Sequence, residues 1–179
     1  NTAVDWLHPP IAKYFQALGI LAFGENALGW RFSSVAFGTL IIFLVVRLTD
    51  VLFKNKALAL LAGLLAAMDG LLLVLSRIAM NDIHVTFFIL LTLLFYAKHR
   101  DYISSLKSSS FFSKYLVLTG ITAGLAMGSK WSGLYVLLPL FIFEEIFFAD
   151  HFSKMKKDAR LSFIIQRIAI LILLPITVY

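Results

Sequence analysis

Six apolar runs with few or no charges follow one another along the 179-residue chain. Each run is shorter than the roughly 20 unbroken apolar residues of an ordinary spanning helix. One such run alone would fit a buried core helix, but six in succession, with no amphipathic helices to shield them, predict an all-α polytopic membrane protein. We expect about six spans, near residues 32–48, 57–75, 82–98, 115–129, 131–149 and 161–179.

The composition excludes several classes of protein. The chain is 60% hydrophobic and only 15% charged, against about 25% charged in an ordinary soluble domain. A water-soluble monomer is therefore excluded, because too little polar surface is present to cover a compact globule. The absence of cysteine excludes disulfides, thiolate metal ligands and cysteine nucleophiles.

The net charge of +6 is concentrated in alternate loops. The basic loops hold Arg47, Lys54 and Lys56, then Lys98, Arg100, Lys107 and Lys114, and then Lys154, Lys156, Lys157 and Arg160. The positive-inside rule places these loops in the cytoplasm. The opposite face then carries the isolated ionisable residues, which are His8, Lys13, Arg31, Arg77, Asp82 and Lys130. This pattern explains the basic charge without a nucleic-acid partner.

Residues 1–30 are predicted to form a non-cytoplasmic loop that contains an interfacial helix. Pro9 and Pro10 suit the start of that helix, and Gly24 suits its end. The segment is too short and too polar for a span, since Lys13 and Gln16 lie within it. No internal repeat and no domain boundary is visible, so residues 1–179 are interpreted as part of one transmembrane domain.

Ionisable residues within the apolar runs are functional candidates, because a charge at membrane depth is costly. Asp69 interrupts the second run and is either functional or a structural carboxylate held by a neighbouring helix. Glu144 and Glu145 lie near the cytoplasmic end of their run and are predicted to be interfacial. Arg167 is predicted to extend outward to the cytoplasmic interface.

Two short segments carry candidate binding chemistry. SRIAMND at 76–82 places Arg77 near Asp82, so a guanidinium could hold a phosphate while the carboxylate orients it or binds a sugar hydroxyl. Alternatively, Asp82 caps a helix and Arg77 anchors the interface. GSKWSG at 128–133 places Lys130 beside Trp131, either as a ligand site or as part of an aromatic belt. His8 is either an acid, base or hydrogen-bond donor, or purely structural, and no metal-binding motif such as HExxH occurs.

Taken in order, four segments resemble the protein O-mannosyltransferase family, polytopic GT-C glycosyltransferases that use a polyprenyl-phosphate sugar donor. The segments are HPPIAKYFQALG (8–19), GWRFSSVAFGTL (29–40), MDGLLLVLSRIAMND (68–82) and GSKWSGLY (128–135). The resemblance covers nearly the whole chain and implies a partial GT-C-type bundle of transmembrane helices.

The resemblance also implies an activity. Mannose would move, with inversion, from dolichyl- or polyprenyl-phosphate mannose to Ser or Thr hydroxyls of an acceptor protein on the non-cytoplasmic face. No metal and no other cofactor is expected. The donor phosphate and sugar would contact Arg31, Arg77, Asp82 and Lys130, while His8, Lys13, Asp69 and Trp131 would lie on the same active face.

One departure from the family pattern concerns the catalytic base. The family carries an Asp-Glu pair upstream of HPP, whereas here Asp5 is followed by Trp6 and lies too near His8. We therefore expect the catalytic pair and the first span to lie upstream of Asn1, and the later spans to lie downstream of this chain. No catalytic residue is assigned within residues 1–179. This part alone is expected to be inactive, and a partner subunit is a further expectation.

Other functions stay open at this point. A related GT-C transferase could move another sugar, such as aminoarabinose, to a lipid. A transporter core could use Asp69 and Arg77 as an intramembrane relay, and a non-catalytic scaffold is a third class. The short segment between Gly24 and Gly29 favours a bacterial plasma membrane over an endoplasmic reticulum membrane.

Overall fold

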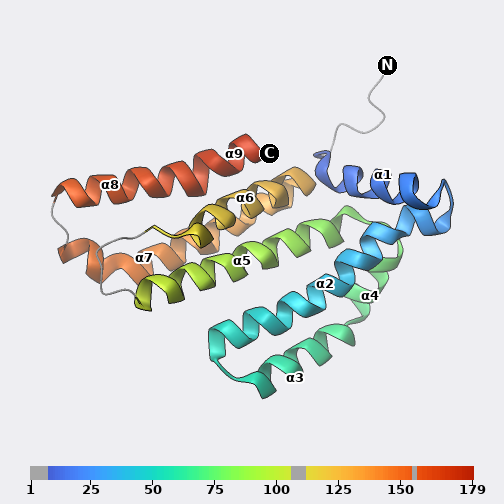
Figure 1. The fold of residues 1–179 in the computed structure, drawn as a ribbon, viewed down its shortest axis with the longest axis horizontal. Coiled ribbons are helices and arrows are strands. Elements are labelled where there is room, and N and C mark those ends of the chain that lie inside the picture. The colour runs from blue at the N-terminus through green and yellow to red at the C-terminus, as the bar shows by residue number, and fades with distance from the viewer. Residues whose placement is uncertain (1–7, 106–111, 155–156) are drawn as a thin grey trace.

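The computed structural model describes residues 8–105, 112–154 and 157–179, and every element in these ranges is helical (Figure 1). The elements are α1 (Ile11–Phe23), α2 (Ala27–Phe53), α3 (Lys56–Ala67), α4 (Gly70–Arg77), α5 (Asn81–Ser105), α6 (Lys114–Ser129), the 3-10 segment η1 (Trp131–Val136), α7 (Leu137–Lys154), α8 (Lys157–Ile168), the π-helical segment η2 (Ala169–Leu173) and α9 (Leu174–Val178).

Three of the described helices are long and apolar enough to cross a membrane, at Ala27–Phe53, Asn81–Ser104 and Arg160–Val178. The third is continuous through most of α8, η2 and α9. The expected span near 57–75 consists of two helices, α3 and α4, which meet at a bend of 57° and count as a fourth if the pair is one span. The apolar run 131–149 is divided between η1 and α7. The all-α polytopic membrane fold is confirmed, and the count of six spans stays a prediction.

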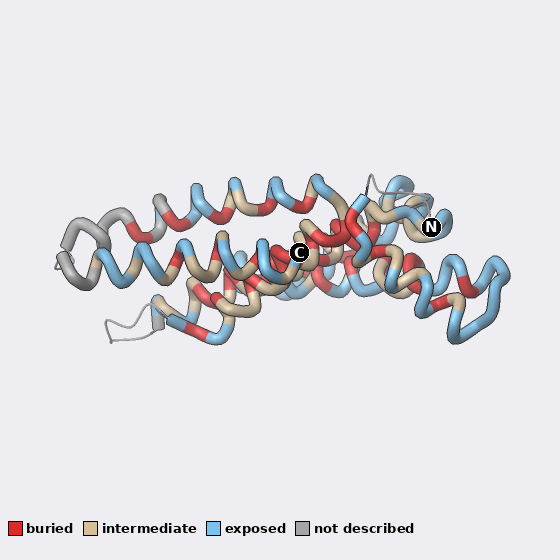
Figure 2. Tube along the Cα trace, turned by 90° about the horizontal axis from the view of Figure 1, so that it is seen from above, coloured by how far each residue is buried: buried red, intermediate tan, exposed pale blue. Residues whose placement is uncertain are grey.

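α5 lies at the centre of the packing, with α2 on one side and α6 on the other (Figure 1). α1 packs against α2, and α9 packs against α6. Buried residues follow the faces on which the helices meet, and exposed residues follow the outer faces (Figure 2). Large apolar side chains lie on these outer faces, among them Leu60, Leu65 and Leu71. That distribution suits a surface that faces lipid.

Small residues allow the helices around α6 to approach closely. A Cβ on Gly120 would lie 2.2 Å from the carbonyl oxygen of Ile170, and one on Gly124 would lie 2.6 Å from the Cβ of Val178. At the end of α6, a Cβ on Gly128 would lie 2.7 Å from Ile11. The three glycines are spaced by four residues, so they lie on one face of the helix, the arrangement that brings membrane helices into backbone contact.

The helix ends have local causes. α1 follows Pro9 and Pro10 and ends at Gly24, whose φ of 84° suits glycine, so the predicted helix is confirmed. The π-helical segment η2 ends at Leu173, two residues before Pro175. A proline has no N–H to donate, and its ring crowds the carbonyl group four residues earlier, here that of Leu171.

Candidate functional site

Asp82 and Lys130, 48 residues apart, form an ion pair with 2.6 Å between Nζ and Oδ1. Asp82 lies in the first turn of α5, and Lys130 is the extended residue between α6 and η1. η1 packs tightly against the end of α6, since a Cβ on Gly133 would lie 2.3 Å from the backbone of Ala126. The pair is about one-third exposed, so its charges are neutralised but remain within reach of a ligand.

Arg31 and Arg77 differ from Lys130 in having exposed guanidinium groups with no hydrogen bond or ion pair to any residue that the structure describes. Arg31 lies near the start of α2, where the Asn26 side chain accepts from the backbone N–H groups of Leu28 and Gly29. Arg77 is the last residue of α4. Two cations are thus available for an anionic ligand.

A side chain of α1 holds the loop between Arg77 and Asp82. Gln16 donates to the carbonyl oxygen of Ala79 at 2.7 Å and to Oδ1 of Asn81 at 3.2 Å. Ala79 has a φ of 55°, in the left-handed region, so the loop turns sharply at this point. Neither Gln16 nor Asn81 was a predicted site residue, although an amide within an apolar helix was a usable signal.

The remaining predicted residues lie around the start of α1 and the end of α6. Lys13 donates from Nζ to the carbonyl oxygen of the exposed His8, at 3.4 Å. Trp131 is exposed, and its ring centroid lies 5.2 Å from that of Tyr179. A Cβ on Gly128 would meet α1, so the two elements approach closely here.

The position expected for the catalytic Asp-Glu pair is not among the residues that the structure describes. The described residues begin at His8, so Asn1 and Asp5 both lie outside them. The position of the Asp-Glu pair upstream of Asn1 therefore stays a prediction.

Asp69 is the N-cap of α4, where its Oδ1 accepts from the backbone N–H of Leu72 at 2.6 Å. Its side chain is exposed at the bend between α3 and α4. A carboxylate at a helix N-terminus satisfies an otherwise unpaired donor and interacts favourably with the helix dipole. In the structure Asp69 thus caps a helix at a break instead of interrupting a continuous span.

A buried histidine ties α5 to α2 close to Arg31. His84 is fully buried, and its Nε2 lies 3.3 Å from Oγ of Ser33. The rings of Phe15 and Phe37 pack against it. This contact fixes the start of α5 relative to the start of α2. The sequence prediction missed His84, because an isolated histidine in an apolar run carries no pattern.

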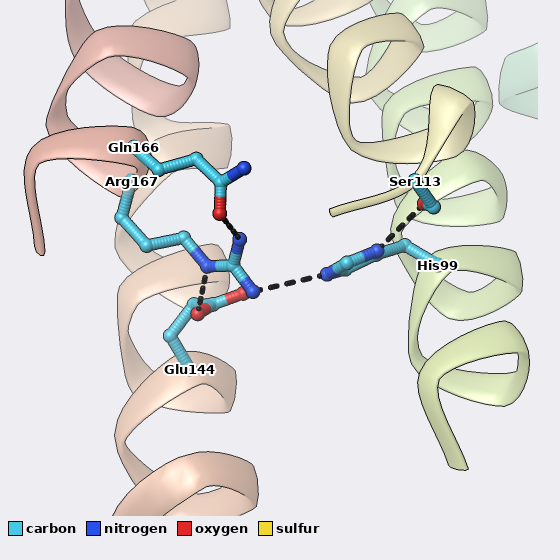
Figure 3. A network of polar contacts seen from close by, with 5 residues as sticks. All are labelled: His99, Ser113, Glu144, Gln166 and Arg167. Carbon is cyan, nitrogen blue, oxygen red and sulfur yellow. Dashed lines mark hydrogen bonds and ion pairs between the residues drawn. The ribbon is translucent and has the colours of Figure 1, made fainter. Parts of the chain in front are cut away.

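A second polar cluster connects α5, α6, α7 and α8 (Figure 3). Arg167 donates from Nε to Oε2 of Glu144 at 2.7 Å, and its NH2 lies 3.2 Å from Nε2 of His99. His99 Nδ1 lies 2.8 Å from Oγ of Ser113, the N-cap of α6. Because a guanidinium only donates, Nε2 is the acceptor and the imidazole proton resides on Nδ1.

The outward orientation predicted for Arg167 is therefore wrong. The residue is 6% exposed and pairs inside the bundle with Glu144, which is 8% exposed. A charge at this depth is stabilised by a partner of opposite sign and by hydrogen bonds, and the aromatic rings of Phe148 and Phe163 add cation–π contacts. The cluster lies far from Asp82, since His99 is 17 residues, or about 25 Å, further along α5.

Within the described ranges, no group of three or more His, Asp or Glu side chains is arranged to hold a metal ion. The polar groups at the Asp82 end of the bundle comprise two arginines, an ion pair and amide side chains. This set is suited to an anionic ligand that also carries hydroxyl groups.

Comparison with known proteins decides the family. The sequence model of the dolichyl-phosphate-mannose-protein mannosyltransferases matches residues 3–179. The chain belongs to this family. The resemblance seen in the four sequence segments is thereby confirmed.

The similar proteins come from bacteria and from a yeast. A polyprenol-phosphate-mannose–protein mannosyltransferase of Corynebacterium glutamicum is 38% identical over 148 residues, which cover 73% of this chain and 28% of that protein. The protein of the same name from Mycolicibacterium smegmatis is 32% identical, with 74% and 28% covered. Dolichyl-phosphate-mannose–protein mannosyltransferase 6 of Candida albicans is 26% identical, with 97% and 25% covered. The chain thus spans about a quarter of the length of these relatives.

Proposed function

We propose that the full-length protein transfers mannose from a polyprenyl- or dolichyl-phosphate mannose to Ser or Thr hydroxyl groups of proteins. The names of the relatives support this donor and a protein acceptor. The observation in the structure that carries the proposal is the pair of exposed guanidinium groups at Arg31 and Arg77, which have no partner among the described residues. We assign to them the phosphate of the lipid-linked donor.

The chemistry requires a stabilised leaving group. The acceptor oxygen forms a bond to the anomeric carbon of mannose while the bond to the phosphate oxygen breaks, and the electron pair leaves with the lipid phosphate. Guanidinium groups can bind that phosphate bidentately and stabilise the charge it gains. The proton of the acceptor hydroxyl goes to a base, and we assign this role to the family's Asp-Glu pair, which is expected upstream of Asn1. No metal ion is assigned a role.

The ion pair between Asp82 and Lys130 is assigned to the sugar of the donor. Only Oδ1 of Asp82 is engaged by Lys130, so its second oxygen can accept a hydrogen bond from a mannose hydroxyl. Lys130 then orients the carboxylate and adds positive charge near the phosphate. We assign His8, Lys13 and Trp131 to the same face, which the positive-inside rule predicts to be non-cytoplasmic.

We also propose which membrane holds the protein. The mycobacterial and corynebacterial relatives favour a bacterial plasma membrane, whereas the yeast relative keeps an endoplasmic reticulum membrane as the alternative. A partner subunit is a prediction of the family resemblance alone.

The experiment measures mannosyl transfer from polyprenyl-phosphate mannose to a Ser/Thr-rich peptide, using membranes that contain the full-length protein. We expect Arg31→Ala and Arg77→Ala each to lower kcat/KM between tenfold and a hundredfold, because a hydrogen bond to a charged group contributes about 1.5–3 kcal/mol. Arg47→Ala is the matched control, since Arg47 is an exposed arginine toward the other end of α2, on the side that the basic residues predict to be cytoplasmic.

The two parts of the proposal fail in different ways. Unchanged transfer in Arg31→Ala and Arg77→Ala would remove the assigned phosphate site. No transfer by a well-folded wild-type protein would contradict mannose transfer to proteins and favour another sugar or a lipid acceptor.

A further inference from the structure

A cavity of about 220 Å³ lies between α2, the end of α3 and α4. Its lining is apolar except for Arg77 and two hydroxyl side chains. The lining residues are Val35, Gly38, Thr39, Ile42, Ala66, Ala67, Leu72, Leu73, Ser76 and Arg77. No step of the proposed reaction uses this space.

The cavity follows from the bend between α3 and α4. The cap at Asp69 starts a new helix at an angle of 57° to α3, so α4 does not continue along the line of α3. α4 contacts α2 where a Cβ on Gly38 would lie 2.6 Å from the Cβ of Ser76. Ala66 and Ala67, at the end of α3, also line the cavity, and their small side chains leave it unfilled.

The polar character of the cavity is confined to Arg77. The hydroxyl of Thr39 donates to the carbonyl oxygen of Val35 at 3.0 Å, and that of Ser76 donates to Leu73 at 2.8 Å. Both hydroxyl protons are therefore committed to the helix backbone. The guanidinium of Arg77 is the group in the lining with uncommitted donors among the described residues.

Arg31 lies on the same face of α2 as the cavity. Val35, Gly38, Thr39 and Ile42 line the cavity, and Arg31 precedes Val35 by one helical turn, a rise of about 6 Å. One cation, Arg77, therefore lines the apolar space, and a second, Arg31, lies one helical turn beyond it on the same face of α2. A ligand complementary to this arrangement carries an anionic head and, attached to it, a hydrocarbon chain.

We propose that this cavity binds the first isoprene units of the lipid-linked sugar donor, next to its phosphate. The inference rests on the proposed function in one respect, that the donor phosphate lies at Arg31 and Arg77. A cavity of about 150 Å³ holds the six carbon atoms of benzene, so a space of 220 Å³ accommodates one to two five-carbon units. The cavity thereby contributes to the choice of lipid, separately from the choice of sugar.

The kinetic test compares mannosyl phosphates that carry a methyl group, a citronellyl chain of two isoprene units or a polyprenyl chain, in membranes with the full-length protein. Ala66→Leu and Ala67→Leu fill the cavity, and Ala57→Leu, an exposed residue at the other end of α3, is the control. We expect the two cavity variants to raise KM about tenfold for the citronellyl and polyprenyl donors and not for the methyl donor. An unchanged KM, or an equal rise for all three donors, would overturn the proposal.

A labelling test does not depend on transfer. Citronellyl phosphate bearing a diazirine in its first isoprene unit should label peptides of α2 and α4 in the wild-type protein. Polyprenyl phosphate should compete with the label, whereas phosphatidylglycerol vesicles and inorganic phosphate should not. Equal competition by phosphatidylglycerol would identify a general lipid site. Competition by inorganic phosphate as strong as that by polyprenyl phosphate would identify an anion site to which the hydrocarbon chain contributes nothing. Either result overturns the proposal.

The two assays also separate this proposal from the proposed function. Specific labelling without mannosyl transfer would refute the function and keep the lipid site. Mannosyl transfer without labelling of α2 or α4 would refute the lipid site and keep the function.

Discussion

The ion pair between Glu144 and Arg167 gives a prediction whose magnitude follows from its burial. Both residues are less than 10% exposed. Nε of Arg167 lies 2.7 Å from Oε2 of Glu144, and its NH2 lies 3.2 Å from Nε2 of His99. Replacing Glu144 by Leu leaves a buried cation without its counter-charge. Such a loss costs about 3–5 kcal/mol, whereas replacing both partners by apolar residues is often nearly neutral.

We therefore expect Glu144→Leu alone to lower the free energy of unfolding by about 3 kcal/mol or more, and Arg167→Met alone by a similar amount. The double variant should lose only about 1 kcal/mol, mainly from the lost contacts of the guanidinium with Phe148 and Phe163. The coupling energy from the double-mutant cycle, which is the sum of the two single losses less the loss in the double variant, should then be about 5 kcal/mol.

The assay is reversible unfolding of the purified full-length protein in mixed micelles, followed by circular dichroism as the denaturing detergent is increased. The exposed pair between Lys54 and Asp101 is the matched control, for which the same cycle should give less than about 1 kcal/mol. A coupling energy for Glu144 and Arg167 as small as that of the control would refute the reasoning from burial.

Two further predictions concern the contacts that position the site. Gln16→Met keeps the size of the side chain but removes the donor to Ala79 and Asn81. We therefore expect kcat for mannosyl transfer to fall about tenfold, with little change in the detergent concentration at the midpoint of unfolding. A change in stability alone would contradict the positioning role. Gly124→Val would place a branched side chain where even an added Cβ would lie 2.6 Å from the Cβ of Val178, so we expect a loss of about 1–3 kcal/mol in the unfolding titration, and an unchanged midpoint would show that α6 and α9 do not approach as closely as the structure has them.

Much of the local structure was predictable because its causes are local. Pro9, Pro10 and Gly24 act within a few residues, and they marked both ends of α1 correctly. The break before α4 was harder to predict, since Asp69 in the sequence is equally consistent with an intramembrane charge and with a helix cap. Only the direction of its side chain, toward the N–H of Leu72, distinguishes the two.

The site was predictable as a set of residue types and not as a set of contacts. The motifs singled out Arg31, Arg77, Asp82 and Lys130, but no pattern in the chain indicated that Lys130 would be paired and the arginines left without a described partner. The outward orientation predicted for Arg167 was wrong for the same reason, because its partners come from two other helices.

The sequence by itself determined the class of the protein, since a chain this apolar can satisfy its backbone in a membrane only through helices or a closed barrel, and its runs and motifs match a helical family. The tertiary structure alone decided which polar side chains meet. These helices are apolar nearly all round, because lipid and protein interior are both apolar, so the sequence pattern does not show which face of each helix turns inward. The rotation and crossing of the helices set that face, and with it the pairing of Asp82 with Lys130, the Gln16 contact to the loop at Ala79 and the cavity beside Arg77.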